Sequence, residues 1–370
     1  MRRSVLLGMA LLAGVAAGPL QAAELSVAVV GPMTGQLAAI GEQMKRGVQA
    51  AIDEINAKGG VQGNTLKIEV GDDQCDPKQA VAVANQLVSK GVKFVVGHAC
   101  SGSSIPASQV YGENEVFMIS PASSAPNFTD AAAKAGWNTV MRTYGRDDAQ
   151  GTFVGTWLAD TRKGKRVAIL HDKSAYGKGL ADEVKKAMNA GGLQEVTYEA
   201  ITAGEKDFSA LVTKLKQTGV DIIYLGGYHG EAGLLIRQAR DQGLNATLMT
   251  GDSLASPEFW KIAGPSGEGT LMSFPKEPRN VPAAKATVEK MKAQGFDPEG
   301  FTLFSTAAVQ VIASGIERAK AAKPEAVAKA LKEGAPSDTV LGPLSFDAKG
   351  DVKNPAYSIY VWHDGNYREM

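Results

Sequence analysis

The stretch Leu25-Ser26-Val27-Ala28-Val29-Val30-Gly31-Pro32 introduces the pattern on which this chain is built. It is a short apolar run that ends at a glycine and a proline, which is typical of a buried strand. Residues 41–57 then carry apolar side chains at helical spacing and stop at Gly59-Gly60, which predicts a helix. A buried strand followed directly by a helix is the repeating unit of α/β proteins.

The same unit recurs in both halves of the chain. Further strands are predicted at 65–70, 93–96, 116–119, 166–170, 195–198, 222–225 and 247–249. The helices between them are predicted at 77–88, 177–190, 208–217 and 231–242. The two runs divide near residues 142–147, so the sequence predicts two Rossmann-like lobes with parallel sheets buried on both faces.

The last quarter of the chain departs from this alternation. Helices are predicted at 281–294, 301–319 and 324–332, and strands at 357–362 and from Tyr367 onward. His363-Asp364-Gly365-Asn366 between the two strands predicts a tight hairpin. Such a tail suits a chain that crosses back between two lobes.

Composition excludes several classes of protein. The 370 residues are 44% hydrophobic, enough for two apolar cores and unlike a disordered chain. The 39 Lys and Arg balance 39 Asp and Glu, so no basic surface is expected for nucleic acid or an anionic membrane. We therefore expect a small and roughly neutral ligand.

The N-terminus predicts export. Met1-Arg2-Arg3 precedes an apolar run over residues 5–17 and small residues up to Ala22 and Ala23, which together resemble a secretory signal peptide over residues 1–23. The alternative is an anchor that stays in the membrane, but the run is short for a spanning helix. Cleavage near Ala22 or Ala23 lowers the basic count from 39 to 37 against 39 acidic residues, a net charge of about −2. The expected location is the periplasm.

The two cysteines allow one disulfide. In an oxidising compartment Cys75 and Cys100 have only each other as partners, and closing that loop should add about 3 kcal/mol of stability. A free reactive thiol is the alternative, with His98 two residues from Cys100 as its candidate base.

Motifs for catalysis and metal binding are missing from the sequence. It has no phosphate loop and no dinucleotide fingerprint after the first strand. Ser101 and Ser103 follow a strand, as a hydrolase nucleophile does, but not within G-x-S-x-G. The four histidines include no close pair with metal-ligand spacing, so we expect no metal, no cofactor and no enzyme activity.

Two serine-rich stretches point instead to ligand binding. Residues 100–104 follow the third predicted strand and residues 120–126 follow the fourth, at the sheet edge where α/β proteins bind ligands. Backbone N–H groups at a helix start, together with serine hydroxyls, suit a carboxylate. Serine is equally a preferred helix N-cap that needs no ligand, so both interpretations stay open.

The second half carries polar and aromatic residues at matching strand ends. Tyr228 and Asp252 follow two strands there, and Asp172 and Tyr176 lie in the first strand–helix loop. An aspartate at such a place suits an ammonium group or caps the next helix. The tyrosines either close a pocket or pack on the lobe surface.

Several ordered stretches resemble the leucine/isoleucine/valine-binding protein family, the periplasmic receptors of branched-chain amino acid ABC importers. The most specific are Asp72-Asp73-Gln74-Cys75-Asp76-Pro77-Lys78-Gln79-Ala80, Gly97-His98-Ala99-Cys100-Ser101, His171-Asp172-Lys173 with Tyr176-Gly177, Ala203-Gly204-Glu205-Lys206-Asp207-Phe208, and Gly226-Gly227-Tyr228-His229. The likeness extends over essentially the whole chain after the signal.

The resemblance implies a type I periplasmic-binding-protein fold, with two lobes joined by three hinge crossovers. The implied lobes are residues 24–142 plus 276–354 and residues 143–275 plus 355–370. It also implies a Cys75–Cys100 disulfide, a monomeric receptor and an inner-membrane ABC permease as partner.

The resemblance also assigns the ligand site, residue by residue. Ser101, Ala122 and Ser124 match the positions that hold the carboxylate and ammonium groups of an α-amino acid. Asp252 matches the acidic partner of the ammonium group, and Tyr176 and Tyr228 match the aromatic residues of the closing lobe. Positions that would line the side-chain pocket are Ile40, Ala99 and Cys100.

Three of these positions depart from the family pattern. The family commonly has tyrosine at the position of Ile40, threonine at that of Ser124 and glutamate at that of Asp252. The headgroup site is therefore better supported than a preference for leucine, isoleucine or valine. The alternatives are a same-fold sensor for an amide or another small metabolite, and an exported hydrolase that uses Ser101.

Overall fold

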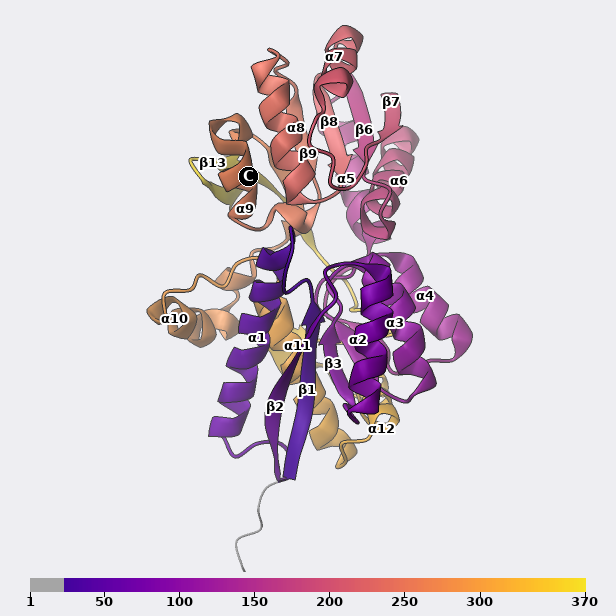
Figure 1. The fold of residues 1–370 in the computed structure, drawn as a ribbon, viewed down its shortest axis with the longest axis vertical. Coiled ribbons are helices and arrows are strands. Elements are labelled where there is room, and N and C mark those ends of the chain that lie inside the picture. The colour runs from indigo at the N-terminus through magenta and orange to yellow at the C-terminus, as the bar shows by residue number, and fades with distance from the viewer. Residues whose placement is uncertain (1–22) are drawn as a thin grey trace, which may run out of the picture.

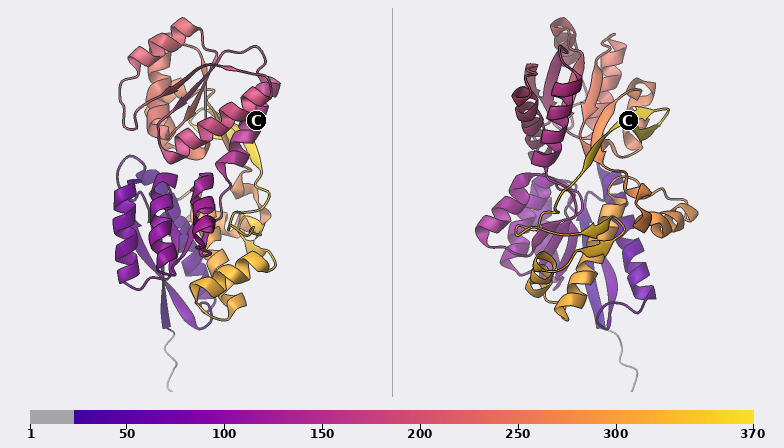
Figure 2. Two further views of the ribbon diagram at one scale, coloured as in Figure 1. Left: turned by 90° about the vertical axis from the view of Figure 1, so that its right-hand side faces the viewer. Right: turned by 180° about the vertical axis from the view of Figure 1, so that it is seen from behind.

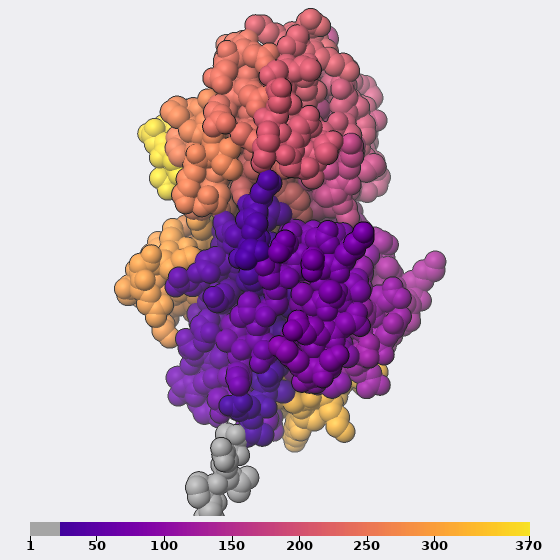
Figure 3. Space-filling model, viewed as in Figure 1, coloured from indigo at the N-terminus to yellow at the C-terminus, as the bar shows by residue number. Residues whose placement is uncertain are grey.

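The computed structural model describes residues 23–370, which form two α/β lobes arranged along the long axis of the molecule (Figure 1). Nearly all of the predicted signal peptide, residues 1–22, lies outside the described residues. The lobes contact each other across a narrow waist, seen on the front face in Figure 3. No helix among the described residues has the length and apolarity needed to span a membrane.

The first lobe is built on a five-stranded parallel sheet in the order β2-β1-β3-β4-β5. Its strands are β1 (Ala23–Gly31), β2 (Asn64–Asp72), β3 (Phe94–Gly97), β4 (Phe117–Ser120) and β5 (Val140–Arg142). Its helices are α1 (Ala38–Ala57), α2 (Pro77–Ser89), α3 (Ser101–Glu113), α4 (Pro126–Ala135), α11 (Thr302–Ala319) and α12 (Pro324–Glu333).

Alternation along β1 explains why both faces of this sheet are covered. Val27 and Val29 are fully buried in the core that includes residues of α1 and α11. Ala28 and Val30 are fully buried on the other face, in the core formed with α2, α3 and α4. Because successive side chains of a strand point to opposite faces, an uninterrupted apolar run requires helices on both sides.

The second lobe is built on a seven-stranded sheet in the order β14-β13-β10-β9-β8-β6-β7. Its strands are β6 (Val167–His171), β7 (Glu195–Ala200), β8 (Ile222–Gly226), β9 (Thr247–Thr250), β10 (Leu271–Pro275), β13 (Tyr357–His363) and β14 (Asn366–Glu369). Its helices are α5 (Asp147–Thr161), α6 (Ala175–Ala190), α7 (Ser209–Thr218), α8 (His229–Asp241), α9 (Glu258–Ala263) and the 3₁₀ turns η1 (Asp252–Leu254) and η2 (Gly264–Gly267). Only β13 and β14 run antiparallel to their neighbours.

The chain passes between the lobes three times, as the predicted fold requires. It leaves the first sheet after β5 and enters α5, then returns after β10 through η3 (Pro278–Asn280), η4 (Pro282–Ala284) and α10 (Lys285–Ala293). After β11 (Ser337–Thr339) and β12 (Gly342–Leu344) it climbs back into β13 (Figure 2, right). The type I periplasmic-binding-protein architecture is therefore present, while the exact lobe boundaries stay a prediction.

Two differences from the expected elements have physical causes, and one local expectation is confirmed. The helix expected from residue 281 begins at Lys285, because Pro282 confines the preceding residues to short 3₁₀ turns. Helix α3 was not predicted, since its serines and an internal Pro106 give it no apolar stripe. The hairpin expected at 363–366 is confirmed, with Asp364 and Gly365 both at positive φ as a two-residue turn demands.

The predicted disulfide is present between Cys75 and Cys100. It joins the loop after β2 to the N-cap residue of α3. This excludes the free-thiol interpretation for this structure. It also ties together two of the loops that border the gap between the lobes.

A fully buried arginine holds the loop after β4. Arg142 is 0% exposed and forms an ion pair with Asp351 at 2.7 Å (Nε to Oδ1). Its guanidinium also donates to the carbonyls of Ser123 (2.9 Å) and Ala125 (3.0 Å). A buried cation requires this full set of partners, so the loop is held in one conformation.

We predict that Arg142→Ala lowers the free energy of unfolding by about 3 kcal/mol or more, because several buried acceptors lose their donor together. Urea denaturation followed by circular dichroism measures this change. The control is Lys58→Ala, which removes an exposed ion pair with Glu54 and should cost below about 1 kcal/mol. Equal losses in the two variants would contradict the structural role of Arg142.

Candidate functional site

The carboxyl ends of the parallel strands in both lobes face the gap between the lobes (Figure 1). One cavity in this gap brings together the residues that the sequence singled out. Its lining is Ile40, Ala99, Cys100, Ser101, Ala122, Tyr176, Tyr228, Asp252, Ser253 and Phe301. All of the predicted site residues except Ser124 are among them.

Ser101 lies at the first residue of α3 and belongs to the wall of the first lobe. Its hydroxyl oxygen accepts the backbone N–H groups of Ser124 (3.2 Å) and Ala125 (3.1 Å). The O–H of Ser101 is thus free to donate to a ligand. Because the first N–H groups of a helix have no partner within it, the start of α3 adds further donors for an anion.

The other serines of the two stretches join the loops to each other. Ser120 Oγ donates to the carbonyl of His98 (2.7 Å), and Ser123 Oγ donates to that of Ala99 (2.9 Å). The N-cap residue of α3 is Cys100, so no serine fills the N-cap position there. Ser124 is buried outside the cavity lining, and its hydroxyl has no hydrogen-bond partner among the described residues.

His98 lies close in sequence to Ser101, but its ring makes contacts with buried residues of the first lobe. Its Nδ1 lies 2.6 Å from Asp73 Oδ2, and its Nε2 lies 3.2 Å from the hydroxyl of Tyr111. With both ring nitrogens engaged, His98 is not placed as a general base for Ser101. This geometry favours binding over nucleophilic catalysis at this serine.

Asp252 forms the opposite wall. It follows β9 and is 2% exposed. Its Oδ1 accepts the hydroxyl of Tyr176 (2.9 Å) and the side-chain amide of Gln150 (3.3 Å). Burial raises the pKa of this carboxyl, and the two hydrogen bonds act in the opposite direction. The result is a desolvated acidic group suited to a cation.

Aromatic and apolar groups complete the cavity. The rings of Tyr176 and Tyr228 pack with their centroids 5.2 Å apart. Ile40 from α1 and Phe301 before α11 contribute apolar surface from the first lobe. These side chains leave about 20 Å³ of free volume, enough for about one water molecule, so the lobes must separate to admit an amino acid.

Four residues that line or support the site were missed in the sequence, one of them Ser253, whose Oγ donates to the carbonyl of Gly227 (2.7 Å). Gln43 in α1 accepts the N–H of Phe301 (3.1 Å) and donates to the carbonyl of Ala255 in the other lobe (3.1 Å). Gln150 and Phe301 were missed as well, since neither lies at the end of a predicted strand. The signal that could have found Gln43 is a polar residue on the apolar face of α1.

The loop with Asp172 resolves one open alternative. Its Oδ1 accepts the N–H (2.9 Å) and the hydroxyl (2.6 Å) of Ser174. Ser174 is the N-cap of α6, accepting the N–H of Gly177 at 2.9 Å. Asp172 therefore supports the cap without being the cap itself.

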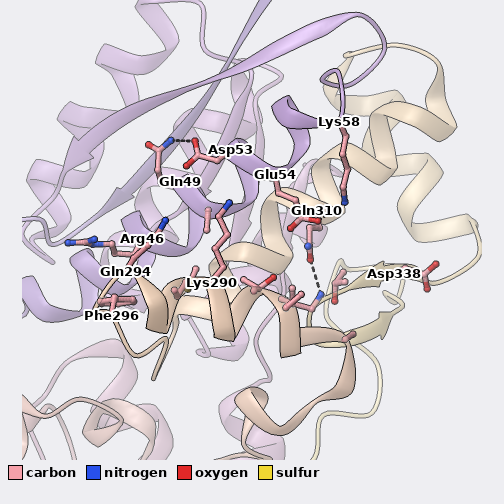
Figure 4. A pocket seen from close by; sticks show the side chains of 17 residues that line it. Arg46, Gln49, Asp53, Glu54, Lys58, Lys290, Gln294, Phe296, Gln310 and Asp338 are labelled. Carbon is pink, nitrogen blue, oxygen red and sulfur yellow. Dashed lines mark hydrogen bonds and ion pairs between the residues drawn. The ribbon is translucent and has the colours of Figure 1, made fainter.

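A surface groove lies between α1 and α10, away from the strand ends (Figure 4). Part of its charge is paired along α1, where Arg46 lies against Glu42 and Lys58 against Glu54. Two other charged residues of the lining, Lys290 and Asp338, form no ion pair among the described residues. The groove receives none of the loops that follow the parallel strands, so the sequence-predicted site residues do not lie in it.

One trio of possible metal ligands occurs within residues 23–370. It consists of Glu268, His363 and Asp364, all exposed at the edge of the second sheet. His363 Nδ1 lies 2.6 Å from Glu268, and this contact raises the pKa of the imidazole. Because a metal ion binds the neutral imidazole, the raised pKa of His363 disfavours metal binding at this exposed trio.

We predict that Asp252→Asn raises the free energy of unfolding at pH 7 when no ligand is bound. A carboxyl with a raised pKa in the folded state stabilises the protein less as pH rises through that pKa. The gain in the free energy of unfolding that Asp252→Asn gives should therefore be largest at high pH and should shrink as pH falls toward 4. Urea denaturation of both proteins at pH 5, 7 and 9 measures it, and a variant that is less stable throughout would contradict the burial argument.

Comparison with known proteins places this geometry in a family. The family model described as periplasmic binding protein matches residues 24–366. A Leu/Ile/Val-binding protein homolog from Brucella suis is 49% identical over 99% of this chain and 97% of its own. The Leu/Ile/Val-binding protein BraC3 of Rhizobium johnstonii is 44% identical over 96% of both chains.

Solved structures agree with the sequence relatives. The leucine-binding protein LivK of Thermotoga maritima superposes with a TM-score of 0.86 at 26% identity, covering 94% of this chain and 97% of that one. The branched-chain amino acid binding protein LivJ of Streptococcus pneumoniae, solved with isoleucine, gives 0.85 at 26% identity over 93% and 98%. The chain therefore belongs to the periplasmic binding protein family.

Proposed function

We propose that this protein is the receptor of an ABC-type importer and binds a branched-chain α-amino acid between its lobes. The observation that carries the proposal is the pairing of opposite partners across one cavity. Helix-start donors at Ser101 face a buried carboxyl group at Asp252. A zwitterion presents the complementary pair of charges on one carbon atom.

Each predicted site residue has a role in this proposal. Ser101 and the start of α3 hold the ligand carboxylate, and Ser124 and Ala122 contribute to the headgroup from the neighbouring loop. Asp252 holds the ammonium group. Tyr176 and Tyr228 close over the headgroup. Ile40, Ala99 and Cys100 surround the aliphatic side chain.

The binding step follows from the geometry of the walls. A ligand that enters between separated lobes first meets the donors of the first lobe. Closure then brings Asp252 and Tyr228 onto it, so the ligand stabilises the closed arrangement by contacts that exist only there. The ammonium group also gives the buried carboxylate of Asp252 the counter-charge that burial otherwise denies it.

The ligand pocket differs from the family pattern in a consistent way. Asp252 is one methylene shorter than the glutamate common in the family, and Ser124 lacks the methyl group of threonine. Ile40 replaces a tyrosine ring. The changes at Ile40 and Asp252 remove atoms from the cavity lining, which favours a ligand larger than the smallest branched-chain amino acid, whereas Ser124 lies outside that lining.

The proposal includes the place of action and the partner. The signal over residues 1–23 exports the chain, with cleavage near Ala22 or Ala23, and the mature monomer works in the periplasm. A permease in the inner membrane then recognises the surfaces that the two lobes present together when closed. The relatives named as Leu/Ile/Val-binding proteins support this assignment.

We predict that leucine, isoleucine and valine bind the mature protein after it is unfolded, dialysed and refolded to remove carried-over ligand. Isothermal titration calorimetry measures the affinities, and mass spectrometry of the protein as purified identifies any ligand that it carries. If neither these three nor any other α-amino acid binds, the proposed function is wrong.

We predict that Asp252→Asn weakens leucine binding by about 30-fold or more, because a buried ammonium group loses its counter-charge. Binding of 4-methylpentanoate, which lacks the ammonium group, should change far less. Asp241→Asn makes the same chemical change at an exposed site of the second lobe and serves as the control. Equal losses for leucine and 4-methylpentanoate would remove Asp252 from the ammonium role.

A further inference from the structure

A second cavity adjoins the first between the lobes. Its volume is about 690 Å³, and it shares Cys100 and Tyr228 with the lining of the first cavity. It is bordered by both lobes, with Gln36 and Gln74 on one side and Asp172 and Glu231 on the other. The room for a longer ligand side chain therefore lies past the disulfide, not in the smaller cavity.

Two carboxyl groups border this second cavity. Asp172 is 3% exposed and Glu231 is 6% exposed. Glu231 lies in the first turn of α8, where its Oε1 accepts the N–H of Gly204 at 2.7 Å. Lys173 is the nearby cation, but its ammonium group extends to the hydroxyl of Thr202 (3.4 Å). Within residues 23–370 neither carboxyl group forms an ion pair.

The two carboxyl oxygens of Asp172 differ in their hydrogen bonding. Oδ1 serves the turn before α6, but Oδ2 is buried and has no hydrogen-bond partner among the described residues. Burial and the proximity of Glu231 raise the pKa of this carboxyl. A serine would make the same kind of turn without a second buried polar atom.

The backbone around Asp172 leaves room for this carboxyl. A Cβ atom at Gly177 would lie 2.3 Å from Oδ1, so only glycine fits there. A Cβ atom at Gly227 would lie 3.5 Å from Oδ2. Because Gly227 has no Cβ atom, a space the size of one methyl group is left beside Oδ2.

We propose that the second cavity is a subsite for a cationic group at the end of the ligand side chain, with Asp172 as its principal partner and Glu231 as a second negative charge. This inference rests on the proposed function, since the α-amino acid headgroup stays at Ser101 and Asp252. It extends the substrate class from branched-chain amino acids to basic ones such as ornithine, lysine and arginine. The side chain of such a ligand passes Cys100 and Tyr228, and its cation supplies the missing partner of Asp172 Oδ2.

The test compares lysine with norleucine, which has the same carbon chain without the terminal ammonium group. Calorimetry on the ligand-stripped mature protein should show lysine binding at least tenfold more tightly than norleucine. Asp172→Asn keeps the Oδ1 acceptor of the turn and removes the charge. It should weaken lysine binding at least tenfold and change leucine binding by less than twofold.

Asp207→Asn is the matched control. Asp207 Oδ1 accepts the N–H of Ser209 (2.9 Å) in the same kind of turn, but the residue is exposed and lies outside the cavity. This variant should leave both affinities unchanged. Thermal unfolding of both variants checks that they are folded.

The outcomes separate this inference from the proposed function. If leucine binds but ornithine, lysine and arginine do not, the subsite is wrong and the proposed function stands. If Asp172→Asn weakens leucine and lysine equally, Asp172 only supports the turn and the subsite is again wrong. If no α-amino acid binds at all, the proposed function fails and the subsite fails with it.

Discussion

Both sheets direct the carboxyl ends of their parallel strands toward the same gap between the lobes. This constraint brings the loops that follow the parallel strands of one lobe close to those of the other lobe. Ser101 and Asp252 lie 151 positions apart in the chain, yet they line one cavity for this reason. The polar headgroup of a ligand can then be bound from two sides, by groups that neither lobe could supply alone.

The same gap concentrates buried polar groups, which generally destabilise a fold unless they are paired. The first lobe satisfies most of its loop groups with a network of serine hydroxyls, backbone carbonyls and the Arg142–Asp351 pair, although the hydroxyls of Ser103 and Ser124 have no partner among the described residues. The second lobe leaves carboxyl oxygens of Asp147 and Asp172 without partners among the described residues, and Asp252 has only neutral ones. The rigid wall thus lies in the first lobe, and the acidic wall that benefits from a cationic ligand lies in the second.

How far the sequence predicts this protein depends on the kind of signal that each element carries. Strands such as β1 and β6 and helices such as α1 and α6 were found because their apolar residues follow a clear period. Helix α3 has no such period, since it packs serines and alanine against its neighbours. Gln150 reaches the site from α5, which no local pattern predicted. Gln43 and Phe301 belong to predicted helices, but not to the strand ends where the site was sought.

The sequence by itself determined the alternation of strands and helices, the single possible cysteine pair and the family to which the chain is similar. These features are local or combinatorial, so spacing and residue type suffice to predict them. Only the tertiary structure decided which serines face the cavity and which join loops, and that His98 serves the core. It also decided that Asp172, which borders a second cavity, keeps one oxygen without a hydrogen-bond partner among residues 23–370. Such facts depend on which side chains meet across the gap, and the physical reason is that burial and pairing are properties of distant residues brought together by the fold.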